Sequence, residues 1–163
     1  MSQVKPGFEQ FLAVVTPQDQ PFVQELHEYL LSNGCKATVE DKKSGMFASY
    51  KHTKSKKSAV NFFNREEGVF VRIYGENIAG YSGFLDTLPQ EMVDSVSRAG
   101  VCKRMVYNTC STKCAGYDFK IRGEHFQKCR YGGLQFLVTQ TSAPFIKSLI
   151  ENEIEQRQPP KTL

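Results

Sequence analysis

The chain has 163 residues, of which 40% are hydrophobic and 23% charged, which suits one globular domain that buries a core without disulfide bonds. Its net charge of +4 is too small to identify a nucleic-acid-binding protein by charge alone. The N-terminal apolar run, residues 11–15, is shorter than a signal peptide or a membrane helix requires. We therefore expect a soluble, cytoplasmic protein with no membrane partner.

The first half of the chain predicts a helix followed by a sheet. Residues 8–15 are apolar and fit either a strand or a helical turn. Between Asp19 and Asn33, apolar residues recur at the spacing of one helix face. The strands predicted after this helix are residues 36–40, 46–52, 59–63 and 69–74. No connection between them is long enough for a parallel crossover, which predicts an antiparallel meander.

The second half of the chain returns to helices around two short strands. The predicted elements are helices over 77–88, over 89–99 and after Ser142, and strands over 117–121 and 134–138. Residues 156–163 are polar and contain two prolines, so we expect this tail to fray. Together the elements predict a single α+β domain over residues 1–163, with an antiparallel sheet packed against several amphipathic helices.

The cysteines are distributed unevenly. Four of the five lie between Cys102 and Cys129, and an odd number without an export signal argues against a disulfide framework. In a reducing compartment, clustered cysteines more often indicate metal binding or redox chemistry. Cys110 and Cys114 have three residues between them, as in a tight metal-binding turn. Segment 102–129 is therefore a candidate metal-binding segment, and zinc is the expected cofactor.

Strand geometry favours one set of zinc ligands. His125 precedes Cys129 by four residues, and a strand spans about 13 Å over that distance. Because bonds to zinc are about 2.0–2.3 Å long, one ion cannot bind both residues if the segment is extended. The favoured set is Cys102, Cys110, Cys114 and Cys129, with His125 as an alternative ligand. Two other interpretations stay open: ordinary buried thiols, or a functional thiol or regulatory disulfide.

A basic segment lies between the second and third predicted strands. It contains Lys51, Lys54, Lys56 and Lys57, and the aromatic residues Tyr50, Phe62 and Phe63 lie beside it. Lysines on phosphates and rings on bases can bind single-stranded nucleic acid. The alternative is a solvated hairpin whose rings belong to the core. The nearby acidic residues Glu66 and Glu67 weaken a basic patch.

No motif in the sequence identifies a reaction. Glycine-rich phosphate loops, nucleophile elbows and paired-carboxylate motifs are absent from it. We expect a non-catalytic protein organised by a structural zinc ion in segment 102–129. One alternative is a module that binds a small ligand or nucleic acid through the sheet and the Lys51–Lys57 segment. The other is a thiol redox protein, which needs an accessible cysteine of lowered pKa.

Three phrases of the sequence resemble an uncharacterised family of small bacterial domains. They are Val71 to Gly75, Gly116 to Phe119, and Gly123 to Tyr131. That family has no assigned activity. The strands followed by Phe136, together with the closing helix, are also similar to the YdhG-like domains, which implies a compact α+β fold sometimes linked with iron handling. Those domains lack the cysteines, so this likeness implies no functional residue.

Overall fold

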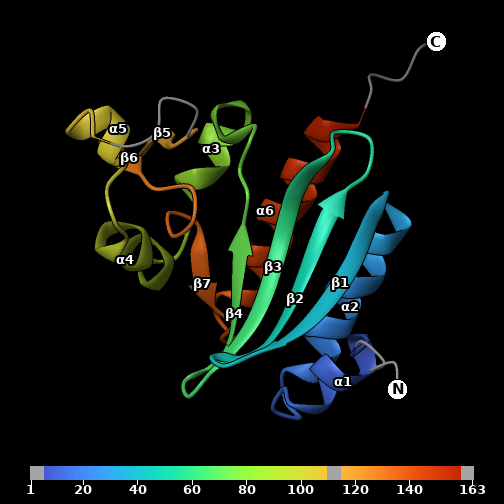
Figure 1. Cartoon of the computed structure of the whole chain (residues 1–163). Helices are drawn as coiled ribbons and strands as arrows, with labels where there is room; N and C mark the ends of the chain where they lie inside the picture. The colour runs from blue at the N-terminus through green and yellow to red at the C-terminus, as the bar shows by residue number, and fades with distance from the viewer. Residues whose placement is uncertain (1–5, 110–114, 159–163) are drawn as a thin grey trace.

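The computed structural model describes residues 6–109 and 115–158 (Figure 1). Its main element is an antiparallel five-stranded sheet with the strand order β1-β2-β3-β4-β7. Its strands are β1 (Cys35–Lys42), β2 (Gly45–His52), β3 (Lys57–Arg65), β4 (Gly68–Ile73) and β7 (Gln135–Leu137). A separate two-stranded sheet consists of β5 (Tyr117–Ile121) and β6 (Glu124–Lys128).

Helices precede, interrupt and close the sheet. α1 (Phe8–Ala13) and α2 (Gln20–Ser32) come before β1, and α6 (Ala143–Arg157) follows β7. Between β4 and β5 lie the 3-10 helix η1 (Ile78–Tyr81), α3 (Ser82–Leu85), α4 (Gln90–Arg98) and α5 (Lys103–Val106). Among these described helices, none combines the length and the apolar character that a membrane crossing needs.

Strands β1 to β4 form the predicted meander, and the α+β class is confirmed. Residues 8–15, which fitted either a strand or a helical turn, contain helix α1. The helix expected over 77–88 is instead two short pieces, η1 and α3. Gly80 and Gly83 lie within these pieces, and glycine is a poor helix former, which explains why a continuous helix does not form.

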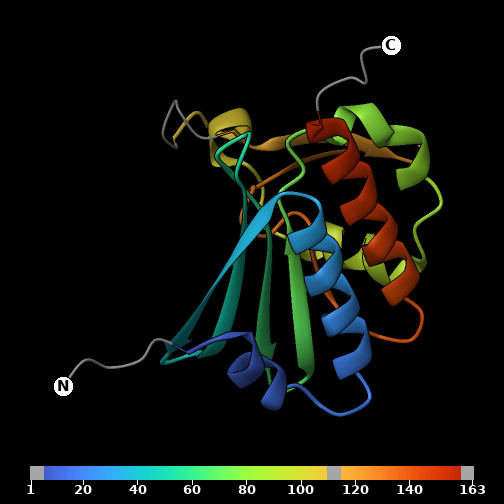
Figure 2. The ribbon, with the colours of Figure 1, turned by 90° about the vertical axis from the view of Figure 1, so that its right-hand side faces the viewer.

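The helices cover one face of the main sheet and leave the other uncovered. Figure 2 shows α1, α2 and α6 on one side of the sheet, and none of the described helices runs along the opposite side of β1, β2 and β3. On the covered side the strands contribute buried residues, among them Ala48, Tyr50, Val60, Phe62, Val71 and Ile73. These side chains share one hydrophobic core with buried residues of all three helices, such as Phe11, Leu26 and Ile150.

Polar side chains attach the two-stranded sheet to the rest of the molecule. The buried hydroxyl of Tyr117 accepts a hydrogen bond from the N–H of Gly75, 2.9 Å away. At the β5–β6 turn, Arg122 has a φ of 51°, a left-handed conformation that costs energy for a residue with a side chain. Its N–H donates to Asp86 Oδ1 at 2.6 Å, and its guanidinium donates to the main-chain oxygens of Asp86 and Leu88. These bonds hold the turn in place.

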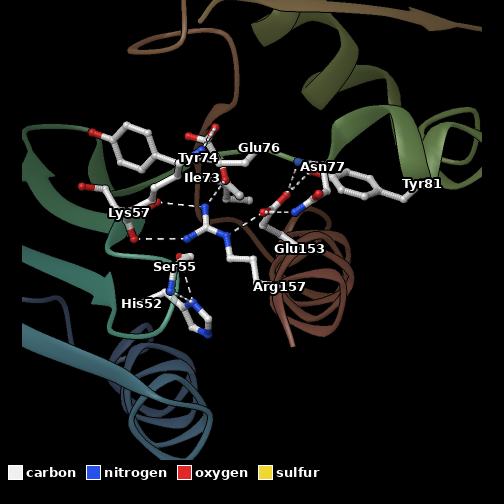
Figure 3. A network of polar contacts seen from close by, with 12 residues as sticks. His52, Ser55, Lys57, Ile73, Tyr74, Glu76, Asn77, Tyr81, Glu153 and Arg157 are labelled. Atoms are coloured by element: carbon white, nitrogen blue, oxygen red, sulfur yellow. Dashed lines mark hydrogen bonds and ion pairs between the residues drawn. The ribbon is translucent and has the colours of Figure 1, made fainter. Parts of the chain in front are cut away.

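Helix α6 ends in a buried polar network (Figure 3). Glu153 and Arg157 form an ion pair at 2.7 Å, and their side chains are 1% and 2% exposed. The carboxylate also accepts hydrogen bonds from Asn77 and Tyr81. The guanidinium donates to the main-chain oxygens of Lys57, Ser58 and Tyr74. Gln156 and Arg157, the first two residues of the expected tail, belong to α6, and this network holds the Arg157 side chain in place.

Candidate ligand-binding face

Two of the four predicted zinc ligands lie in the described part of the chain, on neighbouring segments. Backbone hydrogen bonds of 2.8 and 2.9 Å pair the residues around Cys102 with residues 127–129. These bonds flank an antiparallel bridge between Val101 and Lys128, which places Cys102 and Cys129 on the same side of the pairing. Cys102 is buried and Cys129 is half-buried.

The other two predicted ligands, Cys110 and Cys114, lie outside the described residues. Within 6–109 and 115–158, no three His, Cys, Asp or Glu side chains form a group that could hold a metal ion. Gly116, just after the gap, lies against the Sγ of Cys102, where any larger residue would collide with the thiol. The described residues thus bring Cys102 and Cys129 to one region, but they do not by themselves form a metal site.

His125, the alternative ligand, lies on strand β6 and has another partner. Its Nε2 is 2.6 Å from Asp118 Oδ1, and about half of each side chain is exposed. The hydrogen bond from His125 lowers the pKa of Asp118. Because β6 is extended, His125 and Cys129 are separated by about 13 Å along the chain. At that separation one tetrahedral ion could not bind both residues, and the choice of zinc ligands stays a prediction.

Cys35 does not have the properties of a reactive thiol. It begins β1, opposite His52 on β2, and is 6% exposed. Burial raises the pKa of its thiol to about 11, whereas a nucleophilic cysteine needs a lowered pKa. Burial also lowers the pKa of His52, whose Nδ1 is 2.9 Å from the Ser55 hydroxyl. His52 lies at the β2–β3 turn, and the charge that opposes the rise in the pKa of Cys35 is Arg157, whose effect is smaller than that of burial.

The basic segment forms the turn between β2 and β3. All four of its lysines are exposed: Lys51, Lys54, Lys56 and Lys57. The aromatic residues beside it separate to opposite faces of the sheet, because successive residues of a strand point to opposite sides. Tyr50 and Phe62 belong to the core on the covered side. Phe63 points to the uncovered side. The prediction that the rings beside the basic segment belong to the core therefore holds for Tyr50 and Phe62 but not for Phe63.

Phe63 is part of a row of rings on the uncovered face. The strand register places Phe47, Phe63 and Phe70 opposite one another on β2, β3 and β4. Neighbouring rings are stacked, with centroids 5.9 and 5.6 Å apart and interplanar angles of 15° and 8°. Phe47 and Phe70 are half-buried. The row forms an apolar strip that is three strands wide and does not belong to the core cluster beneath the helices.

Cationic side chains lie over this strip. The Nζ of Lys42 is 4.4 Å from the ring centroid of Phe47. The guanidinium carbons of Arg65 and Arg72 are 4.6 and 5.4 Å from the ring centroid of Phe63. All three distances lie within the range of cation–π contacts. Phe63 is only 2% exposed, and these two guanidinium groups form part of its cover.

The uncovered face is positively charged as well as aromatic. By register, the charged residues of β1–β4 on this side are Lys36, Lys42, Lys51, Arg65 and Arg72, with Glu40 as the carboxylate. Anionic ligands are therefore attracted to it. The three stacked rings and the three cations that lie over them are together called the cationic aromatic face. Its residues are Phe47, Phe63, Phe70, Lys42, Arg65 and Arg72.

Sequence reasoning found only part of this face. Alternation along β4 puts Phe70 and Arg72 on one side, which was a usable signal. Lys42 and Arg65 lie at the ends of hairpin strands, where charged residues are common and carry no distinguishing pattern. The contact between Phe63 and Phe70 was also predictable, because counting residues outward from the hairpin turn between the two strands places them opposite each other.

Comparisons with protein-family models, curated proteins and solved structures give no match to this chain. The resemblance to an uncharacterised bacterial family and to YdhG-like domains therefore stays a prediction from sequence.

Proposed function

We propose that the protein binds single-stranded nucleic acid on the cationic aromatic face. The observation that carries this proposal is the stacked row of Phe47, Phe63 and Phe70 with cations over its rings. Proteins that bind single strands combine a positive surface along the backbone with aromatic side chains that contact the bases. Both components are present here on one uncovered surface.

The arrangement favours a single strand over a duplex. A duplex offers phosphates but keeps the faces of its bases stacked inside, so it would use the cations and leave the rings without a partner. A single strand offers both groups along an extended chain. When its phosphates draw Arg65 and Arg72 away from Phe63, the apolar strip becomes accessible to bases.

A labelled oligothymidylate of about ten nucleotides, a length within the usual site size, tests the proposal by fluorescence anisotropy. The variant Lys42→Gln/Arg65→Gln removes two cations from the face. The matched control Lys103→Gln/Lys120→Gln removes two exposed cations that lie elsewhere. We expect the first variant alone to reduce the slope of log affinity against log salt by about 1.4, from two contacts of about 0.7 each.

Three results would contradict the proposal. Absence of binding by the wild type at low salt would exclude it directly. Equal weakening by the two double variants would indicate attraction to net charge rather than to this face. A duplex that competes as well as a single strand would show that the rings make no contact with bases.

We also propose a structural zinc ion that Cys102, Cys110, Cys114 and Cys129 bind together. The placement of Cys102 and Cys129 on the same side of their backbone pairing supports it. The case for the other two ligands, Cys110 and Cys114, comes from the sequence alone. Thiolates are the preferred ligands of structural zinc. The ion would cross-link segment 102–129 and supply no reaction.

Metal analysis tests the zinc proposal. Protein purified without added metal should contain about one zinc per chain, and Cys129→Ser should lose it. The matched control is Cys35→Ser, because Cys35 lies on the main sheet, away from the cluster. A strong chelator should speed amide exchange over 101–130 and leave 69–74 protected. No zinc in the wild type, or equal protection with and without chelator, would exclude the ion.

A further inference from the structure

A second cluster of aromatic side chains lies on the uncovered side, at the far end of β4. Asn61 points to this side by register and donates a hydrogen bond of 2.9 Å to the Tyr74 hydroxyl, so the Tyr74 ring lies there too. Tyr131 packs edge-on against it, with centroids 6.4 Å apart. Tyr131 is 56% exposed, so part of its ring is open to a ligand.

This cluster also carries positive charge. The guanidinium carbon of Arg130 lies 5.3 Å from the ring centroid of Tyr74 and 6.0 Å from that of Tyr131. Glu76 holds Arg130 at 2.6 Å, and the Nζ of Lys57 is 3.8 Å from the same carboxylate. Two cations against one carboxylate leave a net charge of +1. Lys57 belongs to the basic β2–β3 turn, so that turn borders this cluster.

The spacing along β4 sets a length for the ligand. Phe70 and Tyr74 are four residues apart, which is about 13 Å in an extended chain. Stacked nucleotides of one strand advance about 3.4 Å each. The distance from one cluster to the other therefore corresponds to about four stacked nucleotides, and a dinucleotide cannot reach both.

We infer that Tyr131, together with Arg130 and Tyr74, forms a second base-binding position of the same site, so that a bound single strand runs along β4. The inference rests on the proposed nucleic-acid binding. Glu76 fixes the guanidinium of Arg130 beside the rings, and the exposed face of Tyr131 receives a base. Affinity then increases when the ligand becomes long enough to reach from Phe70 to Tyr131.

A length series of oligothymidylates from two to ten nucleotides tests this inference by calorimetry. We expect the wild type to gain affinity once the strand exceeds about four nucleotides. Tyr131→Ala should remove that gain, a loss of about fivefold or more for the longest ligand, while Tyr131→Phe keeps it. Tyr107→Ala is the matched control, because Tyr107 is 63% exposed and lies at the end of α5.

The outcomes separate the two proposals. If Tyr131→Ala binds the whole series as the wild type does, or weakens the shortest and longest ligands equally, the second position is excluded and the cationic aromatic face alone remains. If Tyr107→Ala loses as much affinity as Tyr131→Ala, the second position is excluded as well. If the wild type binds none of the ligands, the proposed function itself is excluded.

Discussion

The two faces of the main sheet are both aromatic, but they are covered by different kinds of group. Phe62 and Phe63 are neighbours on β3 and are 0% and 2% exposed. Phe62 lies in the core beneath the helices, whereas Phe63 lies between two other rings and beneath Arg65 and Arg72. A helix cannot be displaced without unfolding, whereas an arginine side chain can rotate away. Phe62 and Phe63 are therefore almost equally buried, but only Phe63 can be exposed by moving side chains alone.

The largest expected difference between the faces is in stability. Phe62→Ala removes a fully buried ring from the core and should lower the free energy of unfolding by about 3–5 kcal/mol. Phe47→Ala, on the uncovered face, should cost about 1 kcal/mol, because its half-buried ring gives up less contact when it is removed. Urea unfolding of both variants measures this. Similar losses would show that the uncovered face is a second core.

The second prediction concerns the charges at the edge of the covered face. Arg157→Met should lower the free energy of unfolding by about 3 kcal/mol, because it leaves the buried carboxylate of Glu153 without its cation. The double variant Arg157→Met/Glu153→Gln should recover part of the loss, since no buried charge then remains. Urea unfolding of the single and double variants checks this. A double variant less stable than the single one would contradict the argument.

The third prediction is a loss of stability at high pH. The thiol of Cys35, on the covered face, has a folded-state pKa of about 11 against an ordinary value of 9.0. The unfolded chain therefore releases this proton first. Its contribution is intact below pH 9 and is lost progressively as pH rises toward 11. Cys35→Ala should lose less stability than the wild type between these pH values in urea unfolding. If the free energy of unfolding falls equally with pH in the wild type and in Cys35→Ala, Cys35 does not contribute to the loss of stability.

The smallest expected effect on stability belongs to the uncovered face. Arg65→Met should change the free energy of unfolding by less than about 0.5 kcal/mol, because Arg65 is exposed and its charge has water as an alternative partner. The same variant should nevertheless weaken oligothymidylate binding and reduce its salt dependence. If Arg65→Met loses stability but binds oligothymidylate as the wild type does, Arg65 contributes to folding and not to binding, which would contradict the proposal.

The sequence predicts the covered face better than the uncovered one. Apolar periodicity finds α2, α4 and the meander because each buries one stripe of side chains. It misses the Glu153–Arg157 pair, although Glu153 falls on the apolar stripe of α6 beside Leu149 and Ile150. A charged residue in such a stripe, with an opposite charge four residues later, is the signal that could have found it.

The candidate site is less predictable because it depends on pairing across strands. Phe47, Phe63 and Phe70 lie on three different strands and meet through the register of β2, β3 and β4. The residues of the second cluster are farther apart in sequence, since Tyr131 follows β6 and Tyr74 follows β4. No local pattern predicts that contact. For Cys110 and Cys114, which lie outside the described residues, the sequence remains the whole basis of the zinc prediction.

The position of Arg157 also bears on how the chain folds during synthesis. Strand β7 pairs with β4, and α6 packs on β3 and β4, yet both elements lie in residues 135–157 and leave the ribosome after every other described element. Until then β4 has an unpaired edge, which is a site for wrong association. The four-stranded meander therefore lacks its fifth strand until residues 135–137 have emerged, and Arg157 joins the start of β3 to the end of β4 only after all the described strands have been made.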